Sequence, residues 1–310
     1  MSYIGNVIKE HRSYLGISRK ELSKNACSEK YVYLIEKGER TPSAELVKIF
    51  SDRLGVDLFD YYQYLDCINP IAVRNYINLF NIHRRKNDYK SLKKVTDDAL
   101  KLPDFRNRPW FFEIELNYLC YMVYVENKYN EAIEEAINIL QEIEPKYLNT
   151  IEVVNFYVLL SSCYQLIGDL ENANSVLSLA YKISRDTYKV IKYEHVITSI
   201  RISKISFHYL NSEYEDVIRE GSALYKYQCE YNSYERIHYT YFYLAFAYYK
   251  IGTHSESIEW FKKGIYSLMH DYKPMDVYYI TMQDIFDVLA QNIIGEMELI
   301  SEFKKKYNLE

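Results

Sequence analysis

The sequence predicts an all-α protein with a small N-terminal helical domain and a C-terminal array of helical hairpins. Only nine glycines and six prolines occur in 310 residues, which favours long helices joined by short turns over sheets. Short turn sequences also recur at nearly constant spacing after residue 66, as in a repeat protein. A chain of this length exceeds the usual single core, so we expect residues 1–66 and 67–310 to form separate domains.

The first helix of the N-terminal domain is indicated by apolar spacing. Ile4, Val7, Ile8 and Leu15 would form its buried stripe, and Gly16 would end it.

The second and third helices have clear start signals. Ser18 and Glu21 are spaced as a capping box for the second helix, whose inner face would hold Leu22 and Ala26. The third helix is expected from Ser28 to Glu36 or Lys37, with Val32 and Ile35 one helical turn apart on its buried side. Gly38 could take the left-handed turn after it.

Two further helices complete the predicted domain. Thr41-Pro42 suggests a helix entry with proline at the first helical position, before a helix that ends at Gly55. Asp57 could cap a fifth helix. The apolar residues expected in the fourth and fifth helices are Leu46, Val47, Phe50 and Leu54, then Leu58, Phe59 and Tyr62.

Four sequence segments resemble the helix-turn-helix domain of the XRE/Cro-type repressors and are separated by the spacing found in that family. They are Leu15–Leu22, Ile35–Gly38, Thr41–Ser43 and Leu54–Asp57. The resemblance implies a recognition helix that begins near Ser28 and lies in the DNA major groove. Lysine can donate to guanine and glutamate can accept from cytosine. The expected DNA-binding residues are Arg19, Ser28, Glu29, Lys30, Tyr33, Leu34, Lys37 and Arg40.

Arg19 departs from the family pattern, which often has glutamine at this position, but arginine can hold a phosphate with more charge. The chain has a net charge of −5, which argues against bulk coating of nucleic acid. Residues 1–43 nevertheless contain eight basic and five acidic side chains. Two alternatives are that Glu29, Lys30 and Tyr33 form an ordinary solvated helix face, and that the domain is degenerate and retains only a role in dimerisation.

Six turns divide the rest of the chain into helix–turn–helix units about 40 residues long. They begin at Asn87, Asn127, Gly168, Ser212, Gly252 and Gly295. A helix anchor follows each turn by five residues: Leu92, Ala132, Ala173, Val217, Ser257 and Ile300. The units resemble tetratricopeptide repeats in their small and aromatic positions, so an α-solenoid is expected, with most of the 35 tyrosines packed between helices.

The whole chain resembles the peptide-responsive regulators that join an XRE-type domain to such repeats, the Rgg, PlcR, PrgX and NprR groups, with the Rap proteins as relatives that lack the DNA-binding domain. The resemblance implies a homodimeric, cytoplasmic regulator whose operator binding is controlled by a short signalling peptide in the repeat groove. The expected peptide-binding residues are Asn117, Tyr121, Asn155, Arg201, Tyr239 and Tyr243, with Gln283 as a weaker candidate. For each of these, a polar surface or inter-helix position is the alternative.

Neither catalysis nor a cofactor is expected. The seven histidines show no metal-binding spacing, the five cysteines form no C-x-x-C pair, and no phosphate-binding glycine loop is present. No apolar run is long enough to span a membrane. Two rival interpretations remain: a Rap-type protein-interaction adaptor, and a phage or mobile-element repressor. The operator, the peptide, the sign of regulation and the dimer geometry do not follow from the sequence.

Overall fold

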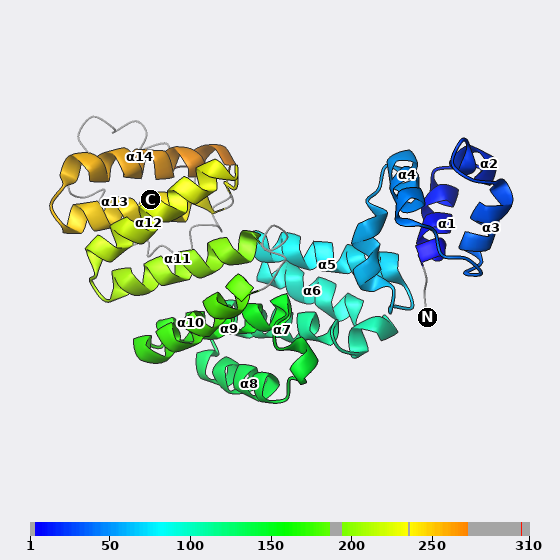
Figure 1. Ribbon diagram of the computed structural model, residues 1–310. Helices are drawn as coiled ribbons and strands as arrows, with labels where there is room; N and C mark the ends of the chain where they lie inside the picture. The colour runs from blue at the N-terminus through cyan, green and yellow to red at the C-terminus, as the bar shows by residue number, and fades with distance from the viewer. Residues whose placement is uncertain (1–3, 187–193, 235, 272–304, 306–310) are drawn as a thin grey trace. The chain divides into compact units, whose positions relative to one another are not determined.

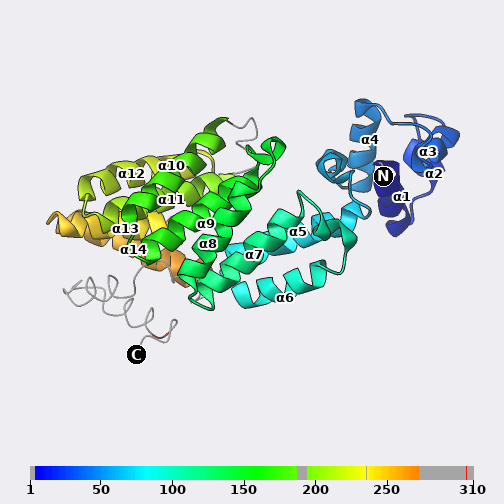
Figure 2. The same ribbon diagram turned by 90° about the horizontal axis from the view of Figure 1, so that it is seen from below.

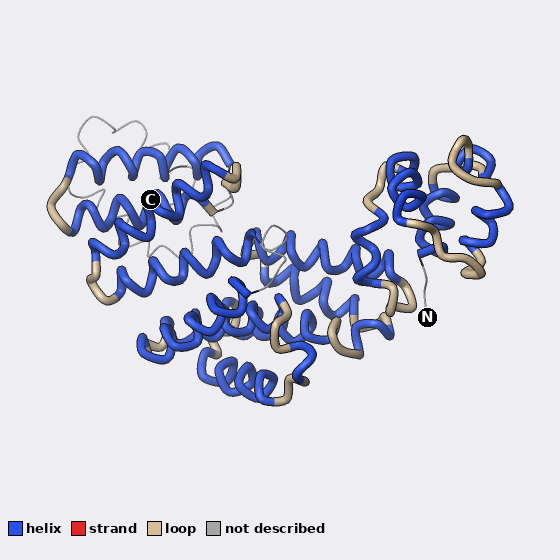
Figure 3. Tube along the Cα trace, viewed as in Figure 1, coloured by secondary structure: helices blue, strands red, loops and turns tan. Residues whose placement is uncertain are grey.

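The computed structural model describes residues 4–186, 194–234, 236–271 and 305, and all regular secondary structure in these ranges is helical (Figures 1 and 3). The chain divides into two compact units. Residues 1–85 and 90–117 form the first unit, and residues 86–89 and 118–310 form the second. The all-α prediction is confirmed for the described residues, whereas the predicted boundary after residue 66 stays a prediction.

The first unit begins with the five predicted helices. They are α1 (Ile4–Tyr14), α2 (Arg19–Ser23), α3 (Glu29–Glu36), α4 (Ala44–Leu54) and the 3-10 helix η1 (Leu58–Tyr64). Helix α1 contacts α3, α4 and η1, and α2 contacts α3. One small core therefore holds the third helix, the predicted recognition helix, in place.

The predicted apolar stripe of α1 is confirmed except at its end. Ile4, Val7 and Ile8 are buried, but Leu15 is 46% exposed. Helix α1 ends at Tyr14, so Leu15 lies in the turn before Gly16, whose φ is +69°. Placing Leu15 in the stripe was wrong because the helical periodicity does not continue past Tyr14.

Both predicted N-caps of α2 and α3 are confirmed. Ser18 Oγ accepts from the Glu21 N–H at 3.1 Å, and Glu21 Oε2 accepts from the Ser18 N–H at 2.7 Å. This reciprocal pair satisfies two free donors at the start of α2. Ser28 Oγ accepts from the Tyr31 N–H at 3.1 Å, and α3 is followed by Gly38 with φ +76°.

The entry to α4 differs from the prediction. Helix α4 begins at Ala44, and Ser43 is its N-cap, with Oγ accepting from the Leu46 N–H at 3.3 Å. Pro42 therefore precedes the helix rather than occupying its first position. The serine hydroxyl satisfies a free N–H group of the first turn, which a proline ring cannot do. Asp57 caps η1 as expected, accepting from the Phe59 N–H at 2.9 Å.

The remainder of the first unit contains α5 (Pro70–Arg85), α6 (Tyr89–Ala99), η2 (Pro103–Arg106) and the first half of α7 (Phe111–Tyr124). Polar contacts fasten it to η1 and to the residues that follow η1. The Asp104 carboxylate accepts from the N–H groups of Ile68 and Asn69 at 2.6 and 3.2 Å. Arg74 pairs with Asp60 at 2.6 Å.

The second unit is an array of helical hairpins. Helices α9 and α10, α11 and α12, and α13 and α14 lie side by side as antiparallel pairs (Figures 1 and 2). The first helices of successive pairs, α9, α11 and α13, also contact one another. The elements are α8 (Tyr129–Gln141), η3 (Pro145–Tyr147), α9 (Ile151–Leu166), α10 (Leu170–Asp186), α11 (Glu194–Leu210), α12 (Tyr214–Glu230), α13 (Ile237–Lys250) and α14 (His254–Asp271).

Five of the six predicted repeat turns are confirmed. Each has a left-handed residue at the expected position, with φ of +51° at Asn87, +55° at Asn127, +82° at Gly168, +60° at Ser212 and +85° at Gly252. The helix anchors after these turns are all buried: Leu92, Ala132, Ala173, Val217 and Ser257. The sixth turn at Gly295 and its anchor Ile300 lie outside the described residues.

Helix α13 contains a run of aromatic residues and lies in the core, in agreement with the expected packing of tyrosines between helices. All residues from 242 to 247 are buried. All of them except Leu244 belong to a buried cluster that includes Val217 of α12 and Phe261 of α14. The tyrosines and phenylalanines of this helix therefore pack between repeats.

Candidate nucleic-acid interface and repeat surface

The exposed side of α3 holds most of the predicted DNA-binding residues. Val32 and Ile35 are completely buried, which directs Glu29, Lys30 and Tyr33 outward. Leu34 is half-buried. The cap residue Ser28 at one end and Lys37 and Arg40 at the other are exposed. The structure thus places this set on one short segment with exposed side chains at both ends.

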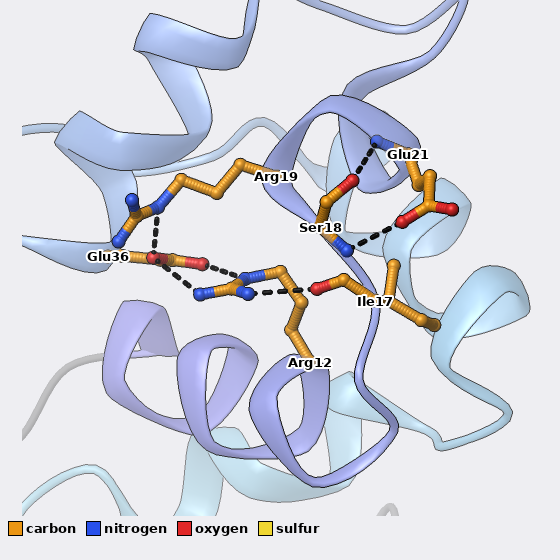
Figure 4. A network of polar contacts seen from close by, with 6 residues as sticks. All are labelled: Arg12, Ile17, Ser18, Arg19, Glu21 and Glu36. Atoms are coloured by element: carbon orange, nitrogen blue, oxygen red, sulfur yellow. Dashed lines mark hydrogen bonds and ion pairs between the residues drawn. The ribbon is translucent and has the colours of Figure 1, made fainter.

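A buried carboxylate lies beneath this surface. Glu36 is 3% exposed and accepts from two arginines (Figure 4). Arg12 Nε lies 2.5 Å from Glu36 Oε1 and Arg12 Nη2 lies 3.3 Å from Oε2, while Arg19 Nε lies 2.7 Å from Oε2. Arg12 also donates to the Ile17 carbonyl at 2.8 Å. These bonds tie the end of α3 to α1 and to the start of α2.

The sequence interpretation missed Glu36. Its position one turn after Val32 and directly after Ile35 places it on the buried side of α3, and this spacing was the available signal. A buried carboxylate requires a partner, and the two arginines provide it.

Arg19, the predicted phosphate contact, is therefore already bound within the protein. Its Nε atom is engaged by Glu36, and its guanidinium carbon lies 5.2 Å from the centroid of the Tyr33 ring. Lys37 Nζ lies 5.8 Å from the same centroid. Tyr33 thus contacts two cationic side chains from different elements.

Three of the predicted peptide-binding residues are buried. Asn117 is fully buried; its Oδ1 accepts from Arg84 Nη1 at 3.2 Å and its Nδ2 donates to Thr96 Oγ1 at 3.0 Å. Tyr239 and Tyr243 are 2% and 7% exposed, within the aromatic core of α13. In this conformation all three side chains pack inside the protein.

The other candidates are half-buried and come from three successive first helices. Tyr121 lies on α7, Asn155 on α9 and Arg201 on α11. The Arg201 guanidinium carbon lies 4.5 Å from the Tyr227 ring centroid, so this cation is held against an aromatic face. Gln283 lies outside the described residues.

An open hollow of about 450 Å³ is present elsewhere, between α5 and α6 of the first unit. None of the predicted site residues lines it. Its lining residues are Ala72, Asn75, Tyr76, Leu79, Lys94, Val95 and Asp98.

One group of possible metal ligands occurs among the described residues: His208, Glu213 and Asp216. One ligand atom of each residue is already engaged by a neighbouring side chain. His208 Nδ1 lies 2.6 Å from Glu213 Oε2, and Asp216 pairs with Arg219. The contacts account for this cluster without an ion.

A helix-turn-helix family model matches residues 8–61. A search of curated protein sequences finds no match to the chain. Among the described residues, no helix combines the length and the apolar composition that crossing a membrane requires.

Several solved structures of transcriptional regulators are similar over nearly the whole chain. Bacillus thuringiensis PlcR in complex with the peptide PapR7 and DNA matches with a TM-score of 0.69 and 18% identity, over 90% of this chain and 98% of PlcR. ComR from S. thermophilus, in complex with DNA and its signalling peptide ComS, matches with a TM-score of 0.56 and 16% identity, over 93% and 99%.

A putative transcriptional regulator from Listeria monocytogenes EGD-e matches with a TM-score of 0.53 and 14% identity, over 99% of both chains. The repeat region and the N-terminal domain are both included in these alignments, since each covers nine-tenths of the chain or more. The chain therefore contains a helix-turn-helix domain and has, over its length, the fold of transcriptional regulators such as PlcR and ComR.

Proposed function

We propose that this protein is a transcriptional regulator that binds an operator in double-stranded DNA through α3, under the control of a short signalling peptide. The observation that supports DNA binding most is the exposed face of α3, which carries Glu29 and Lys30. The buried ion pair between Glu36 and Arg12 holds the opposite side of this helix in place. The similarity to PlcR and ComR, both solved with DNA and a peptide, supports the same function.

The first residues of α3 would contact base edges in the major groove. Lys30 can donate to guanine O6 and N7, and Glu29 can accept from cytosine N4. Ser28, Lys37 and Arg40 lie at the ends of the helix, where phosphates flank the groove. Leu34 lies further along the helix and would contact the edge of a base pair through its apolar side chain.

The regulator would act as a homodimer in the cytoplasm. Two copies of α3 would then enter half-sites about one helical turn, ~34 Å, apart. The peptide would bind to the first helices of the repeats, with Tyr121, Asn155 and Arg201 as the remaining contact candidates. Arg201 would pair with a carboxylate of the peptide. Asn117, Tyr239 and Tyr243 become candidates only if their helices repack when the peptide binds.

DNA binding is tested by selecting duplexes from a random-sequence library with the purified full chain. We expect an enriched sequence, and weaker binding to it by Lys30→Ala and Arg19→Ala. Lys146→Ala is a matched control, because Lys146 is an exposed lysine in the second unit that pairs with Glu144. Equal, salt-insensitive binding by all three variants would contradict the assignment of α3.

Peptide control is tested by panning a synthetic library of short peptides against the same chain. An enriched peptide should change the affinity for the selected duplex severalfold, because coupling between sites typically amounts to ~1–3 kcal/mol. Enrichment of neither a duplex nor a peptide, together with stable capture of a protein partner, would favour the adaptor function instead.

A further inference from the structure

The guanidinium group of Arg19 is bound through its Nε edge, while its Nη edge makes no hydrogen bond among the described residues. Its Nε donates to Glu36 Oε2 at 2.7 Å, and its side chain is 34% exposed. Among the described residues, no hydrogen bond involves either Nη atom of Arg19. A guanidinium held in this way presents two parallel N–H donors to solvent, which is the geometry that binds a phosphate in a bidentate manner.

The charges around Glu36 leave Arg19 able to attract an anion. Arg12 and Arg19 share this one buried carboxylate, so the three side chains together retain one positive charge. Arg12 is the more buried arginine, at 13% exposure, and donates two hydrogen bonds to Glu36, whereas Arg19 donates one. The outward charge of the group is therefore located on Arg19.

Tyr33 supports this arrangement from the surface. Its ring lies 5.2 Å from the guanidinium carbon of Arg19 and 5.8 Å from Lys37 Nζ, both within cation–π range. Arg19 is the first residue of α2 and Lys37 caps the C-terminal end of α3. One aromatic ring thus restrains two cations from separate elements beside the exposed face of α3.

We infer that Tyr33 is a positioning residue for phosphate binding: it holds Arg19 and Lys37 toward the DNA backbone and does not itself read a base. This inference rests on the proposed function, and it revises the expectation that Tyr33 is a base-reading residue. Glu36 fixes the Nε edge of Arg19, the Tyr33 ring restrains the guanidinium, and the open Nη edge meets a phosphate.

The two roles for Tyr33 predict different measurements. Removing a side chain that positions phosphate contacts weakens binding to all sequences equally and lowers the salt dependence of binding. A side chain that reads a base alters the preference at one position of the site. The phenyl ring alone suffices for cation–π contact, whereas hydrogen bonding to a base requires the hydroxyl.

The test compares the full-length wild type with Tyr33→Phe, Tyr33→Leu and Arg19→Gln. Binding to the selected duplex and to its single-base variants is measured at several salt concentrations. We expect Tyr33→Phe to match the wild type. Tyr33→Leu should weaken binding to every duplex by about fivefold at low salt, and the slope of log K against log salt should fall by about one phosphate contact, ~0.9.

The double variant Arg19→Gln/Tyr33→Leu shows whether Tyr33 acts through Arg19. Loss of the ring should then cost less in the Arg19→Gln background than in the wild type. Thermal melts of each variant establish that the domain is folded, and if Tyr33→Leu does not fold, Tyr33→Met replaces it.

A changed base preference in Tyr33→Phe, or full additivity in the double variant, would overturn the inference while leaving the proposed function intact. Failure of the wild type to prefer any duplex would instead contradict the proposed function itself.

Discussion

Arg12 and Glu36 lie 24 residues apart in the chain and form a buried ion pair, with 2.5 Å between Arg12 Nε and Glu36 Oε1. The pair joins α1 to the last residue of α3. Because α3 is only eight residues long, its own hydrogen bonds are too few to stabilise it, and packing against other elements must hold it in place. The direction of its exposed face therefore depends on this contact and on the burial of Val32 and Ile35.

We predict that Glu36→Ala destabilises the first unit strongly. It leaves Arg12, at 13% exposure, and Arg19 close together with no counter-charge. Breaking a buried pair by removing one partner typically costs about 3 kcal/mol or more. Urea unfolding monitored by Trp110 fluorescence measures this loss in a Trp260→Phe background.

The matched control for that loss is Asp52→Ala, which removes the exposed i,i+4 partner of Lys48 in the same unit. An exposed pair of this kind contributes about 0.5 kcal/mol. Equal losses in the two variants would show that Glu36 does not fix α3.

The stability of the first unit should depend on pH through His11. Burial lowers the pKa of His11 below its ordinary value of 6.5, Arg74 lowers it further, and Glu10 opposes both. His11 Nε2 lies 3.0 Å from Tyr61 Oη. Below pH 6.5 the unfolded chain binds a proton that the folded chain does not yet bind, so unfolding becomes easier as the pH falls toward the folded pKa.

His11→Gln should remove this part of the pH dependence. The measurement is the free energy of unfolding between pH 7.5 and about pH 5, where a histidine with its ordinary pKa gains its proton. The slope should be smaller in His11→Gln than in the wild type. An unchanged slope would mean that other groups cause the pH dependence.

Ser212→Gly should stabilise the second unit. Ser212 has φ +60° at the turn between α11 and α12, and a side chain in this left-handed region costs about 1 kcal/mol that glycine avoids. Ser222→Gly is the matched control: Ser222 is exposed in the interior of α12, and its replacement by glycine should destabilise the helix by about 0.5 kcal/mol. Urea unfolding monitored by Trp260 in a Trp110→Phe background should give opposite signs; the same sign for both would contradict the role of the turn.

Gly264→Ala should destabilise the packing of α14 on α13. A Cβ atom at Gly264 would lie 2.9 Å from two atoms of the Phe242 ring, which is completely buried and cannot bend away. Overpacking of this kind costs about 1–3 kcal/mol. Gly221→Ala is the comparison, because its Cβ would approach only one atom, Leu244 Cδ2, within 3.0 Å. Thermal unfolding should show the larger loss for Gly264→Ala, and the reverse order would contradict the account.

Local signals in the sequence predicted much of this structure. The capping box of Ser18 and Glu21 and the left-handed turns at Asn127 and Gly168 depend on residues close together in the chain, so short patterns suffice. The predicted start of α4 was wrong because two adjacent residues, Pro42 and Ser43, both favour the start of a helix. Only the hydrogen bond from the Leu46 N–H to Ser43 Oγ shows which of them begins it.

Contacts between distant residues were not predictable in the same way. The burial of Asn117 depends on Arg84 and Thr96, which are 33 and 21 residues away. The spacing of apolar residues does not show that an asparagine on the first helix of a repeat will be buried with hydrogen-bond partners inside the protein. The pairing of Arg19 with Glu36 could not be predicted for the same reason: the two side chains meet only because α2 packs against α3.

Duplex selection with the wild type and with Lys30→Ala tests whether α3 reads DNA sequence. We expect an enriched sequence with two half-sites for the wild type. For Lys30→Ala we expect relaxed preference at one position in each half-site, with a cost of about 1–3 kcal/mol. No enrichment by the wild type, or the same sequence enriched with equal affinity by Lys30→Ala, would contradict the reading of DNA sequence by α3.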